Sequence, residues 1–209
     1  MVSDLFDANP TTFIPVYYHL GTSVAYKPWC TTRFDFYGVT LMPYMWWDGW
    51  LDGSYTYADW NADLAARQAV PTDMTIGMSS TILVDQLVVD ADVCVEAGGT
   101  TKDVRVYFVV ILDHYPDDAT YYRNAFRQVY TQDVNVPAGD CVHLDHSFTL
   151  EALDLGRPED VGAVVWAQDP LSSGPAEIHQ AAYIIGEDTQ IFHDGFESGD
   201  FSGWSEVVQ

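Results

Sequence analysis

The stretch LVVDADVCVEA, residues 87–97, has the clearest secondary-structure pattern in this chain. Every second residue from Val89 to Val95 is apolar, and the residues between them are polar or cysteine. This two-residue period is typical of a β-strand with one buried face. The stretch therefore predicts a half-buried antiparallel strand that carries Cys94 on its outward face.

The same alternation recurs along most of the chain after Pro71. The segments that carry it are MTIGMSSTI (74–82), LVVDADVCVEA (87–97), KDVRVYFVVILDHY (102–115), CVHLDHSFTLEAL (141–153), VGAVVWAQD (161–169) and EIHQAAYII (177–185). Antiparallel strands with one apolar face each are expected to pair into two sheets. We therefore predict a β-sandwich domain over residues 71–187.

Two connections within this domain have local signals. The glycine-rich turn AGGTTKD (97–103) predicts a hairpin between the second and third strands. The segment DDATYYRNAFRQVY (117–130) predicts a short crossover helix that begins at Asp118.

Residues 1–70 have a different pattern, which indicates a mixed α/β unit. The expected order is a helix ending in LFDANP, a buried parallel strand TFIPVYYHL (12–20), a helix CTTRFDFYG (30–38), a strand PYMWW (43–47), a turn DGWLDG (48–53) and a helix TYADWNADLAARQA (56–69). Thr31 or Thr32 is the expected cap of the second helix, and Gly38 its end.

The charge balance restricts the possible partners. The chain has 8 Lys+Arg against 31 Asp+Glu, a formal net charge of -23. Such a field repels nucleic acid and anionic lipid, and it suits an extracellular or high-salt setting. No apolar run of about 18 residues predicts a membrane span. Met1 leads into VSDLFDANP without a signal peptide, so an exported protein would be a mature or trimmed form.

Three cysteines occur, none in C-x-x-C or metal-ligand spacing. In CVHLDHSFTLE, Cys141 lies on the polar face of its strand, as Cys94 does on its own. On neighbouring strands these two can form a disulfide in an oxidising compartment; two free thiols are the alternative.

The sequence contains no recognisable catalytic constellation. It has no G-x-S-x-G motif, no phosphate-binding glycine loop and no metal-ligand histidine spacing. Asp113, Asp117 and Asp118 fall in one turn, LDHYPDD, which is a weak calcium candidate. A solvated, helix-capping turn is the alternative, and no cofactor is expected.

The stretch FYGVTLMPYMWWDGW, residues 36–50, concentrates aromatic side chains. On a strand, Tyr44 and Trp46 face one side while Met45 and Trp47 face the other. A core or domain interface is one interpretation. The other is that these residues, with Trp50, form a self-association surface or a sugar-stacking platform.

Four segments together resemble a known family. FIPVYYHLG, FYGVTLMPYMWWDG, YYRNAFRQVY and VVWAQDPLSSGPAEIHQAAYII occur in the order found in bacterial outer-membrane lipoproteins that carry a thioredoxin-like domain followed by a β-sandwich. The resemblance covers about residues 4 to 186. It implies a truncated thioredoxin-like unit over 1–70, with Pro43 as its cis-proline.

The chain departs from redox-active thioredoxin-like proteins at the dithiol. In such proteins the C-x-x-C pair lies at the start of a helix. This chain is expected to contain only the end of that helix. Cys30 lies beyond the following strand and has no partner within three residues. Because thiol exchange needs an attacking thiolate and a resolving thiol, we expect no dithiol activity.

Residues 188–209 form an acidic, Gly/Ser-rich tail. DGFESGDFSGW resembles a C-terminal segment of secreted bacterial proteins. The tail is either a remnant linker or an alternating strand, and the hypothesis for the second is strand addition to a neighbouring subunit. Its aromatic residues are the expected contacts: Phe192, Phe196, Phe201 and Trp204.

Together these features predict a non-catalytic structural or interaction protein of the bacterial cell surface. We expect it to bind a second copy of itself or another cell-surface protein. The contacts would come from the tail and from an aromatic hairpin that carries Tyr44, Trp46, Trp47 and Trp50. The alternatives are a thiol-disulfide oxidoreductase using Cys30 and a carbohydrate-binding module that stacks polysaccharide on exposed tryptophans.

Overall fold

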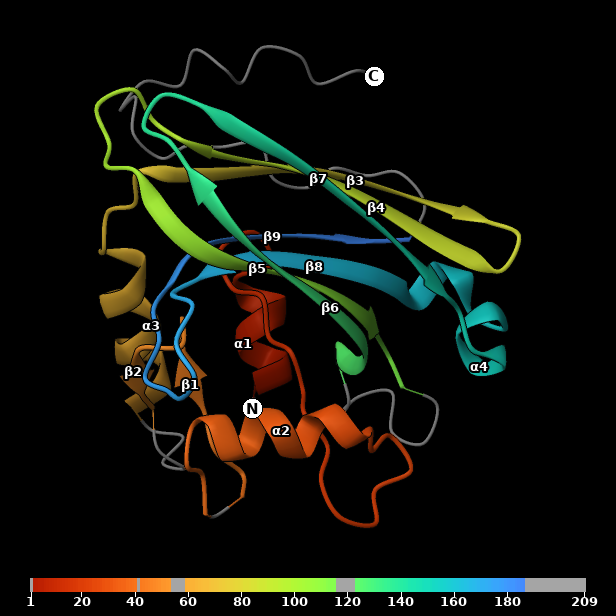
Figure 1. The fold of residues 1–209 in the computed structure, drawn as a ribbon. Coiled ribbons are helices and arrows are strands. Elements are labelled where there is room, and N and C mark those ends of the chain that lie inside the picture. Colours follow the sequence, from red (N-terminus) through yellow and green to blue (C-terminus); the bar gives the residue numbers. More distant parts are fainter. Residues whose placement is uncertain (1, 41, 54–58, 116–122, 187–209) are drawn as a thin grey trace.

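The protein is described by a computed structural model over residues 2–40, 42–53, 59–115 and 123–186. Figure 1 shows three layers: a three-stranded sheet, a four-stranded sheet beneath it, and a layer of helices with a small hairpin below both. The helices are α1 (Val2–Ala8), α2 (Pro28–Phe36), α3 (Trp60–Gln68), α4 (Ala152–Leu155) and the 3-10 turn η2 (Pro158–Asp160). None of the described helices is long and apolar enough to cross a membrane.

The strands form three antiparallel sheets. Their bounds are β1 (Trp46–Trp47), β2 (Leu51–Asp52), β3 (Met74–Leu83), β4 (Gln86–Val95), β5 (Lys102–Leu112), β6 (Ala125–Val136), β7 (Cys141–Thr149), β8 (Val161–Gln168) and β9 (Ile178–Ile185). The orders are β1-β2, β3-β4-β7 and β6-β5-β8-β9. All six strands expected after Pro71 are confirmed, so the β-rich antiparallel character is as predicted.

The two larger sheets face each other across one apolar core. The alternating residues of β4, from Leu87 to Val95, are buried there, as are Val106 and Phe108 of β5. The four-stranded sheet is buried on its other face too, where Val109 and Trp166 belong to a second apolar cluster with residues from 1–70. Because β5 and β8 are covered on both sides, their sequences are nearly continuous apolar runs.

The expected hairpin at AGGTTKD is wrong. β4 pairs with β3 and β7, whereas β5 pairs with β6 and β8, so residues 97–103 cross from one sheet to the other. Glycine-rich turns occur both in hairpins and in connections between two sheets, and the local sequence does not distinguish these two cases. Facing sheets lie only about 10 Å apart, a gap that a short connection spans.

The crossover helix expected at residues 117–130 is also wrong over its described part. Ala125–Val136 is the strand β6, paired with β5 along its length apart from one bulge. Its first six residues, AFRQVY, contain apolar positions that also suit a helix. Pairing with the central strand outweighs that local preference.

Two expectations for residues 1–70 need correction. TFIPVYYHL forms no strand, only a single parallel bridge between Tyr17 and Ala125 at the start of β6. The second helix begins at Pro28 rather than near Thr31, because proline fits the first helical turn, where its missing N–H costs nothing. Its end is as expected, with Gly38 at a φ of +61° just beyond.

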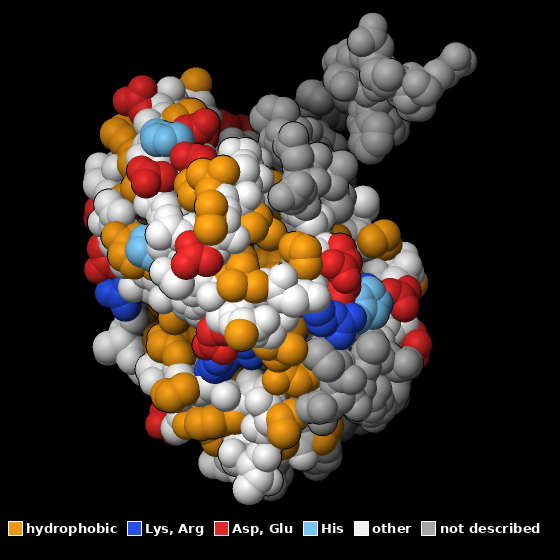
Figure 2. All heavy atoms as spheres, turned by 90° about the vertical axis from the view of Figure 1, so that its right-hand side faces the viewer, with side chains coloured by type: hydrophobic (Ala, Val, Ile, Leu, Met, Phe, Trp, Pro, Cys, Tyr) orange, Lys and Arg blue, Asp and Glu red, His pale blue; other side chains and the backbone are white. Residues whose placement is uncertain are grey.

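The acidic charge is spread over the face of the molecule that Figure 2 shows. On the face in Figure 2, carboxylate side chains lie scattered among apolar ones, and basic side chains are few. This distribution fits a solvated acidic surface rather than one concentrated cation site.

Candidate functional site

The aromatic stretch folds into a small hairpin on the helical side of the molecule. Trp46 pairs with Asp52 and Trp47 with Leu51, and the turn places Asp48 and Gly49 at positive φ. The peptide bond between Met42 and Pro43 is cis, at the proline for which the resemblance implied it.

The two sides of the hairpin have different environments. Trp47 is buried and lies against the ring of Phe13, with 5.4 Å between ring centroids. Trp46 is half-buried and stacks on Tyr37 at 4.8 Å, with Tyr44 on the same side. Trp50 is 53% exposed. Since Trp47 is in the core and Tyr37 covers Trp46, these three tryptophans do not form an exposed coplanar row.

The turn of the hairpin is anchored to the first residue of β9 and to the segment before it. The Ala176 N–H donates to the Gly49 carbonyl at 2.9 Å, and the Ile178 N–H donates to the Asp48 carbonyl at 2.7 Å. Arg67 of α3 adds an ion pair to Asp48 at 3.0 Å. The hairpin is therefore a fixed part of the molecule.

Beside the hairpin lies Arg33 of α2, which sequence reasoning missed. It is only 5% exposed. Its Nη2 donates to the Tyr37 hydroxyl at 2.7 Å and to Gln168 Oε1 at 3.0 Å. Rings surround its guanidinium carbon at 4.6–5.9 Å, a cation–π arrangement; they belong to Trp29, Phe36, Tyr37, Tyr107 and Trp166.

The spacing of the α2 residues was an available signal. Trp29, Arg33 and Tyr37 follow one another at four-residue intervals, which brings side chains together on one side of a helix. Burial raises the pKa of the Tyr37 phenol, so its hydroxyl stays neutral and accepts from both Arg33 and Gln168. We refer to Arg33, Tyr37 and Gln168 as the Arg33 cluster.

The Arg33 cluster borders a pocket. Arg33, Tyr37, Pro43, Trp46 and Trp166 all line it, with the extended residues 12–20 on another side. Pro43 thus lines the same pocket as these aromatic rings and the guanidinium.

The cysteines occupy two different environments. Cys94 and Cys141, a register pair of β4 and β7, are joined by a disulfide. Cys30 is fully buried and free, and burial raises the pKa of its thiol. Cys30 therefore has neither exposure nor a second free thiol within this chain.

We expect the Cys30 thiol to be unreactive in the folded protein. Mixed with DTNB at neutral pH, the native protein should release nitrothiophenolate no faster than it unfolds, because thiolate character and access are both low. In urea, one thiol per chain should react, and the Cys30→Ser variant should give none. Rapid stoichiometric labelling of the native protein would contradict the buried, inert thiol.

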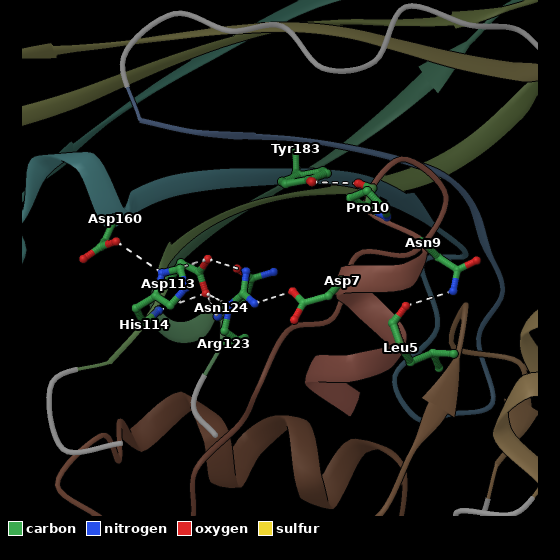
Figure 3. A network of polar contacts seen from close by, with 10 residues as sticks. All are labelled: Leu5, Asp7, Asn9, Pro10, Asp113, His114, Arg123, Asn124, Asp160 and Tyr183. Carbon is green, nitrogen blue, oxygen red and sulfur yellow. Dashed lines mark hydrogen bonds and ion pairs between the residues drawn. The ribbon is translucent and has the colours of Figure 1, made fainter. Parts of the chain in front are cut away.

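Asp113, one of the calcium candidates, forms an ion pair with Arg123. Figure 3 shows Arg123 between Asp113 and Asp7, joining the end of β5 to α1. Arg123 donates to both carboxylate oxygens of Asp113, at 2.6 and 2.9 Å, and to Asp7 at 2.6 Å. Among the described residues no group of three or more His, Cys, Asp or Glu is arranged to hold a metal ion.

Several predicted site residues lie outside the described ranges. They are Asp117 and Asp118 of the calcium candidate and the tail residues Phe192, Phe196, Phe201 and Trp204.

The fold and the site define a β-rich protein in which a short helical unit with an aromatic hairpin covers one sheet. No family model matches the chain, and no curated protein is similar to it in sequence. Among solved structures, HBP35 of Porphyromonas gingivalis is similar, with a TM-score of 0.61, 13% identity and 76% of this chain covered. The chain spans 58% of the length of HBP35.

Two other similar structures have lower scores. A domain of the outer membrane lipoprotein Omp28 from Porphyromonas gingivalis has a TM-score of 0.42 and 11% identity, over 56% of this chain and 89% of its own. The β-glucosidase from Kluyveromyces marxianus has a TM-score of 0.33 and 12% identity, over 56% of this chain and 14% of its own. At these identities the similarity concerns the fold alone.

Proposed function

We propose that this protein is a non-catalytic interaction protein of the bacterial cell surface that associates with a second copy of itself through the aromatic hairpin. Its architecture in this proposal is a thioredoxin-like unit, residues 1–70, on a β-sandwich, residues 71–187. The observation that carries the proposal is the exposure of large apolar side chains in the turn of a fixed hairpin and just before its first strand. Met42 is 62% exposed and Trp50 is 53% exposed.

Exposed apolar residues on a rigid element suit an interface. Tryptophan and methionine are enriched in protein–protein interfaces, and a truncated interface tryptophan often costs about 2 kcal/mol or more. Because the turn is held by two backbone hydrogen bonds, the hairpin loses little conformational entropy when it is covered.

Two observations support export and a surface location. A structural disulfide such as Cys94–Cys141 persists in oxidising compartments and is rare in the cytosol. The net charge of -23 keeps an exposed protein soluble. The family resemblance of residues 4–186 also supports export and a surface location.

The two alternative functions have less support. Thiol-disulfide exchange would need an accessible thiolate, and Cys30 is buried. A carbohydrate platform would need a row of exposed rings, and Trp50 is the one strongly exposed member of Trp46, Trp47 and Trp50. Strand addition by the tail remains a prediction from the sequence.

Sedimentation velocity over a range of micromolar concentrations tests the proposal. The wild type should associate reversibly, and Trp50→Ser combined with Met42→Ser should weaken the dimer by about ten-fold or more. Leu83→Ser is the matched control, since Leu83 is 57% exposed at the far end of β3. A wild type that stays monomeric at high concentration, or an equal effect of the control, would overturn the proposal.

A further inference from the structure

Arg33 differs from the other basic residues in its electrostatic surroundings. All 8 Lys and Arg of the chain lie within the described ranges. Each of the others forms an ion pair with a carboxylate: Lys27, Arg67, Lys102, Arg105, Arg123, Arg127 and Arg157. Arg33 has no carboxylate partner among the described residues, although the chain has 31 acidic side chains.

The partners that Arg33 does have are neutral. The Tyr37 hydroxyl and the Gln168 amide oxygen both accept from one nitrogen, Nη2. A buried charge without a counter-ion costs several kcal/mol. Cation–π contacts contribute about 0.5–2 kcal/mol each and offset that cost, but a neutral ring supplies no counter-charge to the guanidinium.

The same pocket holds hydrogen-bond donors that have no acceptor. The indole nitrogens of Trp46 and Trp166 are both buried without a hydrogen-bond partner among the residues that the structure describes. Trp166 is 3% exposed, and its ring centroid lies 5.6 Å from the Arg33 guanidinium carbon. Trp46 stacks on Tyr37, whose ring centroid lies 4.6 Å from the same carbon. Arg33, Trp46 and Trp166 all line the pocket. The carboxylates in the lining are each paired with a basic or histidine side chain; they are Asp48, Asp73, Asp92 and Glu177.

We propose that this pocket binds an organic carboxylate with an aromatic or aliphatic body. A guanidinium offers paired donors that match a carboxylate, and the indole N–H groups provide two further donors nearby. The ring walls suit an apolar body. Such a site goes beyond the self-association proposed above and is independent of it, since it uses Arg33 rather than Trp50.

The net charge of the chain gives this site an unusual salt dependence. A charge of -23 repels an approaching anion from outside, and salt screens this long-range repulsion. The buried contact with Arg33 is screened much less. Binding should therefore hold or strengthen as salt rises, in contrast to an exposed ion pair.

NMR of the tryptophan indole N–H signals tests the proposal with 3-phenylpropionate as the probe. In the wild type, the Trp46 and Trp166 signals should shift saturably, and 3-phenylpropanamide, which has the same body without the charge, should bind at least ten-fold more weakly. N-acetylphenylalanine, run in parallel, distinguishes a peptide C-terminus from a free acid as the source; binding of either supports the carboxylate assignment.

Variants separate the site from general charge effects. Arg33→Met should abolish the shifts, whereas Arg105→Met, which removes the same charge from an exposed ion pair with Asp133, should leave them unchanged. Equal binding of acid and amide to the wild type, or no binding of either acid, would overturn the proposal even if Arg33→Met does not fold. Trp50→Ser alone, which changes no residue of the pocket lining, should leave carboxylate binding intact even if it weakens self-association.

Discussion

Replacing Asp113 with alanine is expected to lower the free energy of unfolding by about 3–5 kcal/mol, because it leaves a largely buried arginine without its main partner. Asp113 is 3% exposed and stands at the end of β5 (Figure 3). Its carboxylate accepts from Arg123 and also from the backbone N–H groups of His114 and Asn124, at 2.9 and 3.2 Å. Alanine removes all of these acceptors at once.

Asp7→Ala is the matched control for this change. Asp7 accepts from the same arginine, but its side chain is 60% exposed, so its loss should cost about 1 kcal/mol or less. Urea unfolding of both variants, monitored by tryptophan fluorescence, gives the two values. Similar losses for Asp113→Ala and Asp7→Ala would show that burial of the Asp113 carboxylate is not what stabilises this junction.

Replacing Gly49 with alanine is expected to detach the aromatic hairpin and to lower the free energy of unfolding by about 2–5 kcal/mol. This loss is the sum of the strain of a left-handed alanine and the cost of overpacking. Gly49 has a φ of +66°. A Cβ there would lie 2.2 Å from the Ala176 carbonyl oxygen, 2.6 Å from Gln168 Nε2 and 2.7 Å from the Tyr37 hydroxyl. The first of these is backbone and cannot turn away.

The same substitution should disturb the Arg33 cluster, because two of the three clashing groups belong to it. Gly21→Ala is the control: Gly21 has a φ of +69° and no atom within 4 Å of a new Cβ. It should therefore show the conformational strain alone, about 1–2 kcal/mol. Urea unfolding with near-UV circular dichroism of the stacked Tyr37–Trp46 pair measures both effects. A loss for Gly49→Ala no greater than that for Gly21→Ala would contradict the close packing of the turn.

Individual strands were predictable because their pattern is local. The two-residue period from Val89 to Val95 marks the buried face of β4 whatever its neighbours are. The same rule placed Tyr44 and Trp46 on one side of the hairpin and Trp47 on the other. Beyond Tyr130, the residues TQDVNV of β6 are mostly polar and exposed, so no such signal marks the rest of that strand.

Connections were harder to predict because they depend on which sheet each strand joins. The glycines at 98 and 99 indicate a turn between β4 and β5, but only the pairing of β4 with β7 shows that the chain changes sheets there. Likewise, TFIPVYYHL has the composition of a buried strand, and it contacts β6 through one bridge at Tyr17.

The amino-acid sequence is enough to predict an acidic, β-rich protein with apolar strands, a second helix that ends at a glycine, and an aromatic hairpin. These features follow from side-chain period, charge and turn chemistry, which act between near neighbours in the chain. Which partners surround each charged side chain depends on the tertiary structure. Arg33 and Gln168 are far apart in the chain, and folding places them 3.0 Å apart in a pocket where the arginine has no carboxylate partner among the described residues. The electrostatic character of that pocket depends on three-dimensional distances, because Coulomb energy falls with separation in space and not along the chain.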